Sequence, residues 1–223
     1  MAKVATGTPP GICAMERRLS RPLSALVCTG TPSTGSGVIE AVGERVNGWK
    51  PGDRVMALLS GMGHATKVAV HERMLMPVPA NLTMAEAASI PEVFLTAYDA
   101  LFLQCELTLG ESVLVHAAGS GVGTAAVQLA HAASCRTFGT AGSAEKIEQA
   151  RALGLDVGIN YHEEDFAEVV QRETGGAGVH VILDVIGAPR AWDVVGGGGA
   201  DAGACPHEPR QRPRRRRGAR WRA

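Results

Sequence analysis

Residues 112–129 read SVLVHAAGSGVGTAAVQL, an apolar run that leads through a glycine-rich turn into a helical pattern. The run predicts a buried strand, and the small residues after it predict a tight connection into a helix. Glycines at 119, 121 and 123 would let a phosphate approach the N–H groups of a helix N-terminus, where the helix dipole favours anions. Because residue 124 is Thr, the strict dinucleotide-binding pattern GxGxxG does not fit, and a turn selected only for close packing is the alternative.

The chain continues from this turn as alternating strand and helix patterns. Such alternation predicts a parallel sheet with helices on both faces. The stretch VHVILDV at 179–185 is almost entirely apolar, as expected for a strand buried on both sides. The predicted strands span 112–117, 136–141, 157–160 and 179–185, and the predicted helices span 122–133, 144–152 and 163–173. We predict an α/β fold whose Rossmann-type sheet is partial, because such sheets usually have about six strands.

The residues before the glycine turn predict a smaller β-rich unit. Thr83 and Glu86 have the spacing of a capping box for a short helix, and PEVFLTAYDALFL at 91–103 predicts a second helix with Pro91 in its first turn. Three short strand patterns precede them, at 38–43, 54–59 and 65–70.

Charge is unevenly distributed along a chain whose formal net charge is zero. Residues 191–223 carry eight basic and three acidic residues, and residues 1–37 carry four basic and one acidic residue. Residues 38–190 carry ten basic and eighteen acidic residues, so the middle of the chain is acidic and both ends are basic. The last segment has no periodic apolar set, so we predict a disordered, Arg-rich tail at 191–223. This tail attracts phosphates in general, but it has one aromatic residue, Trp221, and no folded motif, so nucleic-acid binding is not expected.

Neither a metal site nor a membrane segment is predicted. The five cysteines form no Cys-x-x-Cys pair and no Cys/His cluster with zinc spacing. We interpret His116, on the strand before the turn, as a structural histidine with satisfied hydrogen bonds. Scattered cysteines indicate a reducing compartment, and the chain has neither a signal-peptide pattern nor an apolar run of the ~20 residues that span a membrane. We expect a cytoplasmic protein.

The end of the second predicted strand indicates which dinucleotide would bind. NAD sites usually place an Asp or Glu there for the ribose 2′-hydroxyl, whereas residues 140–146 read TAGSAEK. Ser143 offers a hydroxyl and Lys146 a cation, and both suit the 2′-phosphate of NADPH. The alternative is that Ser143 only caps a helix and Lys146 is a solvated surface residue.

Six motifs together resemble those of the zinc-independent quinone oxidoreductases, the zeta-crystallin-like branch of the medium-chain dehydrogenase/reductase superfamily. They are GWKPGDRVMALL, IPEVFLTAYDAL, VLVHAAGSGVGTAAVQLA, TAGSAEK, INYHEEDF and VILDVIG, in the family's order over roughly 38–189. The resemblance implies NADPH-dependent reduction of quinones or similar electrophilic carbonyl compounds, without a metal. Because the cofactor carries the hydride chemistry, the protein would mainly hold donor and acceptor together.

The resemblance also implies which residues contact NADPH. The family's phosphate loop, AxxGxxG in many members, falls on Ala117, Ser120 and Gly123, with Ser120 in place of the middle glycine. The further implied contacts are Gly121 and Val122 at the pyrophosphate, Ser143, Lys146 and Tyr161 at the 2′-phosphate and adenosine, and Thr96, Val185, Ile186 and Gly187 toward the nicotinamide. No catalytic residue is assigned.

The chain departs from that family at both ends, as a truncated or altered member would. Family members begin with a longer GroES-like domain and usually dimerise through a sheet edge that has no match here. We divide the chain into an unassigned segment 1–37, a partial GroES-like β domain with its linking helix at 38–107, an incomplete dinucleotide-binding domain at 108–190 and the tail 191–223. The alternative function is that of a catalytically impaired NADP-binding protein with a binding or regulatory role.

Overall fold

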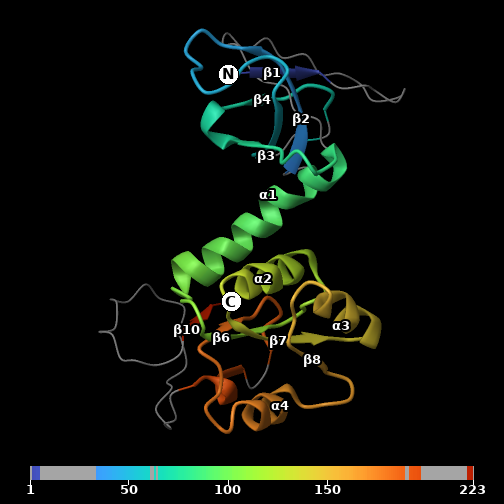
Figure 1. The fold of residues 1–223 in the computed structure, drawn as a ribbon, viewed down its shortest axis with the longest axis vertical. Helices are drawn as coiled ribbons and strands as arrows, with labels where there is room; N and C mark the ends of the chain where they lie inside the picture. Colours follow the sequence, from blue (N-terminus) through green and yellow to red (C-terminus); the bar gives the residue numbers. More distant parts are fainter. Residues whose placement is uncertain are drawn as a thin grey trace. The chain divides into compact units, whose positions relative to one another are not determined.

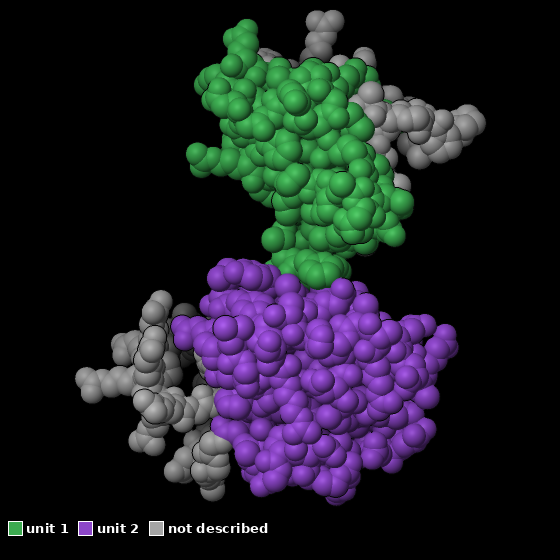
Figure 2. Space-filling model, viewed as in Figure 1, with its two compact units in different colours: residues 1–95 green, residues 96–223 purple. Residues whose placement is uncertain are grey.

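The computed structural model describes residues 2–5, 34–60, 63, 65–188, 191–196 and 220–222, with the backbone alone for 2–5, 192 and 220–222. The chain divides into two compact units, residues 1–95 and 96–223, which Figure 2 colours separately. The division falls inside a single helix, which we expected to belong with the β domain.

Unit 1 is built on an antiparallel sheet of five strands in the order β4-β1-β2-β3-β5. Its apolar core contains Ile39, Val55 and Leu75, all less than a tenth exposed. The strands are β1 (Ala2–Ala5), β2 (Thr34–Val42), β3 (Arg54–Leu58), β4 (Ala69–Val70) and β5 (Leu75–Pro77), and a short 3-10 helix, η1 (Glu72–Met74), precedes β5.

Two strands of unit 1 differ from their predicted lengths. β2 begins at Thr34 rather than at 38, because residues 34–38 pair in register with β3 and the side chains of Thr34 and Ser36 are buried. The small and polar residues TGSG gave no apolar pattern that would have marked this start. β4 contains only two residues of the predicted strand 65–70.

The two predicted helices before the glycine turn are one continuous helix, α1 (Met84–Tyr98). The capping box is present, because the Thr83 N–H donates to Glu86 Oε2 at 2.8 Å and the Glu86 N–H donates to Thr83 Oγ1 at 3.3 Å. Pro91 therefore lies inside the helix rather than in its first turn. Because proline has no N–H, the helix lacks one backbone hydrogen bond at this position. The helix nevertheless continues past Pro91 and leads into a π-helical segment, η2 (Asp99–Gln104).

Unit 2 contains the predicted parallel sheet, with strand order β10-β9-β6-β7-β8 (Figure 1). The chain runs outward from β6 through β7 to β8 and then returns to place β9 on the other side of β6. This reversal is the topological switch point of a Rossmann-type fold. The elements are β6 (Ser112–Val115), α2 (Gly121–Ala132), β7 (Arg136–Ala141), α3 (Ala144–Arg151), β8 (Val157–Asn160), α4 (Phe166–Glu173) and β9 (Val181–Leu183).

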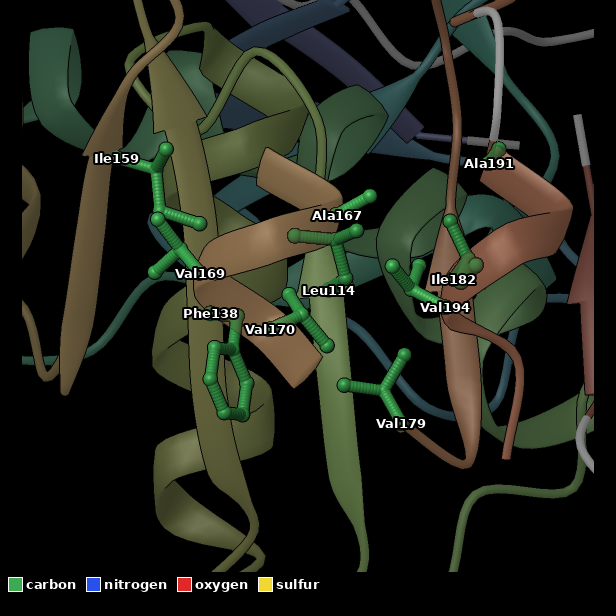
Figure 3. Packing of buried hydrophobic residues seen from close by; sticks show 10 residues of the cluster. All are labelled: Leu114, Phe138, Ile159, Ala167, Val169, Val170, Val179, Ile182, Ala191 and Val194. Carbon is green, nitrogen blue, oxygen red and sulfur yellow. The ribbon is translucent and has the colours of Figure 1, made fainter. Parts of the chain in front are cut away.

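Helices cover both faces of this sheet, as predicted. Strand residues such as Leu114 and Phe138 pack against α4 in a buried apolar cluster (Figure 3). On the opposite face the strands present Gly139 and Gly158, where an added Cβ would press on Leu155 and Ile147. Glycine at these positions lets α3 and the segment that follows it approach the sheet closely, and the predicted α/β class is confirmed.

The expectation of a disordered tail is wrong for the part of 191–223 that the structure describes. A 3-10 helix, η3 (Ala191–Val194), buries Ala191 and Val194 against the α4 face, and Val195 bridges to Val179. The backbone of β10 (Arg220–Arg222) pairs in parallel with β9. Residues 197–219 and 223 lie outside the described part of the chain.

Replacing Leu114 by Ala should lower the free energy of unfolding of unit 2 by about 2–5 kcal/mol, because the side chain is completely buried and its removal leaves a cavity. The matched control is Leu109→Ala, the same chemical change at a side chain that is 79% exposed. Urea titrations followed by far-UV circular dichroism measure both variants. Equal losses would contradict the assigned packing.

Candidate dinucleotide-binding site

The glycine turn lies at the switch point, where the carboxyl ends of β6 and β9 adjoin. The His116 N–H donates to the Leu183 carbonyl at 3.0 Å, and the Ala118 N–H donates to the Thr140 carbonyl at 2.9 Å. The turn is thus held by the strands on both sides of it. Ala117 adopts a positive φ of 53°, a strained conformation for a residue with a side chain.

Gly123 brings α2 against this turn. A Cβ at Gly123 would overlap the carbonyl oxygen of Ala117 and would stand 2.8 Å from the Cα of Ala118. Ser120 is the N-cap of α2, because its Oγ accepts the Gly123 N–H at 3.1 Å. Among the described residues, no acceptor bonds to the N–H groups of Gly121 and Val122. The N-terminus of α2 therefore presents two unpaired N–H donors.

Lys146 lies over the turn, although it belongs to the next helix. A Cβ at Gly119 would stand 3.1 Å from the Cβ of Lys146 and 3.3 Å from its Cγ and Cδ. The methylene stem of Lys146 therefore fits against the bare backbone of Gly119. The Lys146 ammonium forms no ion pair within the described residues.

Ser143 caps the helix that carries Lys146, and Tyr161 lies against the residue before Ser143. Ser143 is the N-cap of α3, because its Oγ accepts the Lys146 N–H at 3.4 Å. The ring of Tyr161 lies against Gly142, where an added Cβ would overlap the phenol hydroxyl. No acidic residue lies between Ala141 and Ser143. The cap that the sequence left as an alternative for Ser143 is present, and it leaves the hydroxyl hydrogen of Ser143 available to donate.

Asp184 organises the turn after β9, a role that we did not predict from the sequence. Its carboxylate is buried and accepts the N–H groups of Ile186 at 2.9 Å, Gly187 at 2.8 Å and Ala188 at 2.7 Å. These bonds leave Val185 and Ile186 with about half of their surface exposed. An acid directly after an apolar strand and before Ile-Gly was the available signal, because such residues bond to the backbone of the turn they begin.

His116 is only partly satisfied, in contrast to the expectation for a structural histidine. Its Nδ1 lies 3.0 Å from Thr140 Oγ1, while Nε2 is buried with no hydrogen-bond partner in the described part of the chain. The ring meets Phe166 edge-on, with centroids 4.8 Å apart. Burial lowers the pKa of His116, and the nearby Asp184 carboxylate partly opposes that shift. The neutral imidazole is therefore favoured.

The structure brings most of the predicted residues to one edge of the sheet. Residues 117–123 and Ser143, Lys146 and Tyr161 lie around the ends of β6, β7 and β8, and Val185 and Gly187 follow the end of β9. Thr96 lies in α1, with an exposed side chain that makes no hydrogen bond to these residues within the described chain. Cofactor contact by each of these residues stays a prediction.

The described residues hold neither a cluster of metal-ligating side chains nor a membrane-spanning helix. No group of three or more His, Cys, Asp or Glu side chains there is arranged to hold a metal ion. Among the helices that the structure describes, none has the length and apolar character needed to cross a membrane.

Residues 121–196 match the family of zinc-binding dehydrogenases. These residues form a zinc-binding-dehydrogenase-like domain of the medium-chain dehydrogenase/reductase superfamily. The superfamily implied by the motifs is confirmed, whereas the quinone oxidoreductase branch stays a prediction.

The chain is similar both to polyketide synthases and enoyl reductases and to quinone oxidoreductases. Over 164 residues the chain is 37% identical to highly-reducing polyketide synthase 1 of Aureobasidium melanogenum, covering 71% of this chain and 7% of that protein. The CurK enoyl reductase structure aligns with a TM-score of 0.67 at 36% identity, covering 75% of this chain and 50% of that one. The Escherichia coli quinone oxidoreductase complexed with NADPH aligns with a TM-score of 0.65 at 32% identity, covering 74% and 51%. The chain thus spans about half the length of these structures.

Replacing Gly123 by Ala should lower the free energy of unfolding by about 1–3 kcal/mol, because the new methyl group meets backbone atoms of 117–118 that cannot rotate away. Gly48→Ala is the matched control, since a Cβ there meets nothing within 4 Å. Urea midpoints measure both. An equal midpoint for Gly123→Ala and the unchanged protein would disprove the close approach of α2 to the turn.

Proposed function

We propose that the chain binds NADPH at the carboxyl edge of its parallel sheet and reduces quinones or related conjugated carbonyl compounds by hydride transfer. The observation that carries the proposal is the glycine turn at the switch point, with two open N–H donors at its helix. Open α/β sheets bind their ligands outside the carboxyl ends of the strands at this point.

The residues present fit the diphosphate of a dinucleotide. The N–H groups of Gly121 and Val122 would donate to it, at the end of a helix whose dipole favours negative charge. The Ser120 side chain is small, and its hydroxyl oxygen accepts the Gly123 N–H within the turn. The positive φ of Ala117 turns the chain between the end of β6 and the start of α2.

The residues at the adenosine end fit NADPH better than NADH. Lys146 would supply a cation and Ser143 a hydroxyl donor, while Tyr161 would form a flat wall beside Gly142. The position where an acid would accept the 2′-hydroxyl of NADH is occupied by Ala141, Gly142 and Ser143. We also propose a cytoplasmic location, because the scattered cysteines indicate a reducing compartment.

The exposed turn after β9 would hold the reactive end. Bound NADPH supplies a hydride, so the chain needs no nucleophile of its own. Asp184 fixes the backbone of 185–188, and the exposed Val185 and Ile186 would exclude water from one side of the acceptor. Precise placement of donor and acceptor is the main contribution that such a protein makes to the rate.

A second candidate acceptor is a conjugated enoyl thioester. It is favoured by the identity with a polyketide synthase and by the alignment with an enoyl reductase. Quinones and enoyl thioesters share an electrophilic carbon conjugated to a carbonyl group, so the same hydride donor serves both. The third candidate is an NADP-binding protein without turnover, because the chain spans about half the length of the solved enzymes it matches.

Loss of NADPH absorbance by the purified full chain discriminates the candidates. We expect turnover of an ortho-quinone above the rate without protein. Turnover of a trans-2-enoyl thioester alone would favour the second candidate. Binding of NADPH without either reaction would favour the third, and an absence of any NADPH-dependent rise in melting temperature would overturn the proposal.

Replacing Lys146 by Met should raise the dissociation constant for NADPH by about tenfold, because a charge-assisted hydrogen bond to the 2′-phosphate is lost. The dissociation constant for NADH should stay within about twofold of its original value. Met keeps an unbranched stem over Gly119. The control is Lys50→Met, the same loss of charge at an exposed residue of unit 1. Calorimetric titration measures both cofactors, and equal losses for NADPH and NADH would refute the role of Lys146.

A further inference from the structure

Three buried polar side chains form a row across the carboxyl edge of the parallel sheet. The register of β6 with β7 and β9 places His116 between Thr140 and Asp184, because the residues directly before them pair with one another. Thr140 is 1% exposed, and His116 and Asp184 are each 2% exposed. His116 directly precedes the glycine turn and Asp184 directly precedes the turn 185–188. The row therefore joins the two turns that would hold the two ends of the cofactor.

One nitrogen of the His116 ring has a partner and the other has none. Nδ1 lies 3.0 Å from Thr140 Oγ1. Nε2 is buried, and nothing in the part of the chain that the structure describes bonds to it. Buried polar atoms are almost always hydrogen-bonded, because an unpaired one has lost its bonds to water without replacing them. The orphaned Nε2 therefore indicates a partner that direct protein contacts do not supply.

The Asp184 carboxylate is an acceptor with unused capacity beside this ring. Its Oδ1 accepts two backbone N–H groups, whereas its Oδ2 accepts only that of Ala188, at 2.7 Å. A carboxylate oxygen has two lone pairs, so Oδ2 can accept a further hydrogen bond. The carboxylate lies close enough to His116 to oppose the lowering of the His116 pKa by burial. Polar groups that face each other without a direct bond are commonly bridged by one buried water.

We propose that His116 is a positioning residue that holds the turn 185–188 through Asp184. The Thr140 hydroxyl donates to Nδ1, the neutral ring carries its proton on Nε2, and this N–H reaches Asp184 Oδ2 through one bridging water. The inference rests on the proposed hydride transfer, for which the turn 185–188 would hold the reactive end. A fixed turn keeps donor and acceptor aligned, so His116 acts on the rate of transfer rather than on the affinity for NADPH.

The position of the proton on the His116 ring tests the proposal without any cofactor. Nitrogen-15 NMR of the full chain at about pH 7 distinguishes the two ring nitrogens of a neutral histidine. The signals that disappear in His116→Gln are those of His116. We expect the proton on Nε2. A proton on Nδ1, donated to Thr140, would overturn the proposal, because Nε2 would then have nothing to donate.

Amide hydrogen exchange at Ile186, Gly187 and Ala188 tests the link to the turn. His116→Phe keeps an aromatic ring against Phe166 and removes both ring nitrogens, so these three amides should exchange about fivefold faster than in the unchanged chain. His116→Gln keeps an N–H donor near the position of Nε2, so its exchange rates should stay within about twofold of the original rates.

The strand amides of β7 and β8, in the same sheet, are the matched control for a general loss of structure. An equal acceleration at these strand amides would overturn the specific role of His116. Unchanged exchange at 186–188 in His116→Phe would overturn it as well. The proton position is measured on the unchanged chain, so it decides the proposal even if His116→Phe does not fold.

The rate of NADPH oxidation with an ortho-quinone tests the effect on the reaction. His116→Phe should lower kcat by about fivefold and leave the dissociation constant for NADPH within about twofold. Weaker NADPH binding with an unchanged kcat would overturn the positioning role. An absence of turnover in the unchanged chain would overturn the proposed function, while the proton position and the exchange rates would still decide whether His116 holds the turn.

Discussion

The close approach of Gly123 to the Ala117 carbonyl is the constraint on which the candidate site depends. Any side chain at 123 would push α2 away from the end of β6. With glycine there, the helix begins immediately beyond the sheet, and the Ser120 hydroxyl closes the turn by capping the Gly123 N–H. Two N–H groups at 121 and 122 are then left open at the switch point. A candidate anion site follows from the packing of one helix against one strand.

The remaining site residues gather there because all pairs in the sheet are parallel. Parallel pairing places the carboxyl ends of β6, β7, β8 and β9 at one edge, so loops distant in sequence become neighbours. In two places the bare backbone of a glycine lies against a long side chain from another segment: Lys146 of α3 lies over Gly119, and Tyr161, after β8, lies over Gly142. On the other side of β6, Asp184 uses its buried carboxylate to hold the turn 185–188. Small residues and one buried acid thus shape the edge.

Local patterns predicted the features that arise within a few residues. The strand-to-helix transition at 112–129, the capping box of Thr83 and Glu86 and the parallel α/β class all depend on periodicity and on hydrogen bonds within one turn. Features that depend on distant partners were missed. The start of β2 at Thr34 requires β3 beside it, the passage of α1 through Pro91 has no local signal, and residues 191–194 order only because the face of α4 is there to bury them.

The sequence by itself determined which residue types are present for a candidate phosphate site, because glycines, Ser143 and Lys146 are chemically suited to phosphate where a strand meets a helix. The sequence also determined that no acidic residue directly follows β7, because that position can be identified from the order of residues alone. Only the tertiary structure decided which residues share the edge. The stem of Lys146 over Gly119, the ring of Tyr161 beside Gly142 and the half-satisfied His116 each join segments that touch only after the sheet has formed. Contacts of this kind depend on the register between strands, and no local pattern encodes that register.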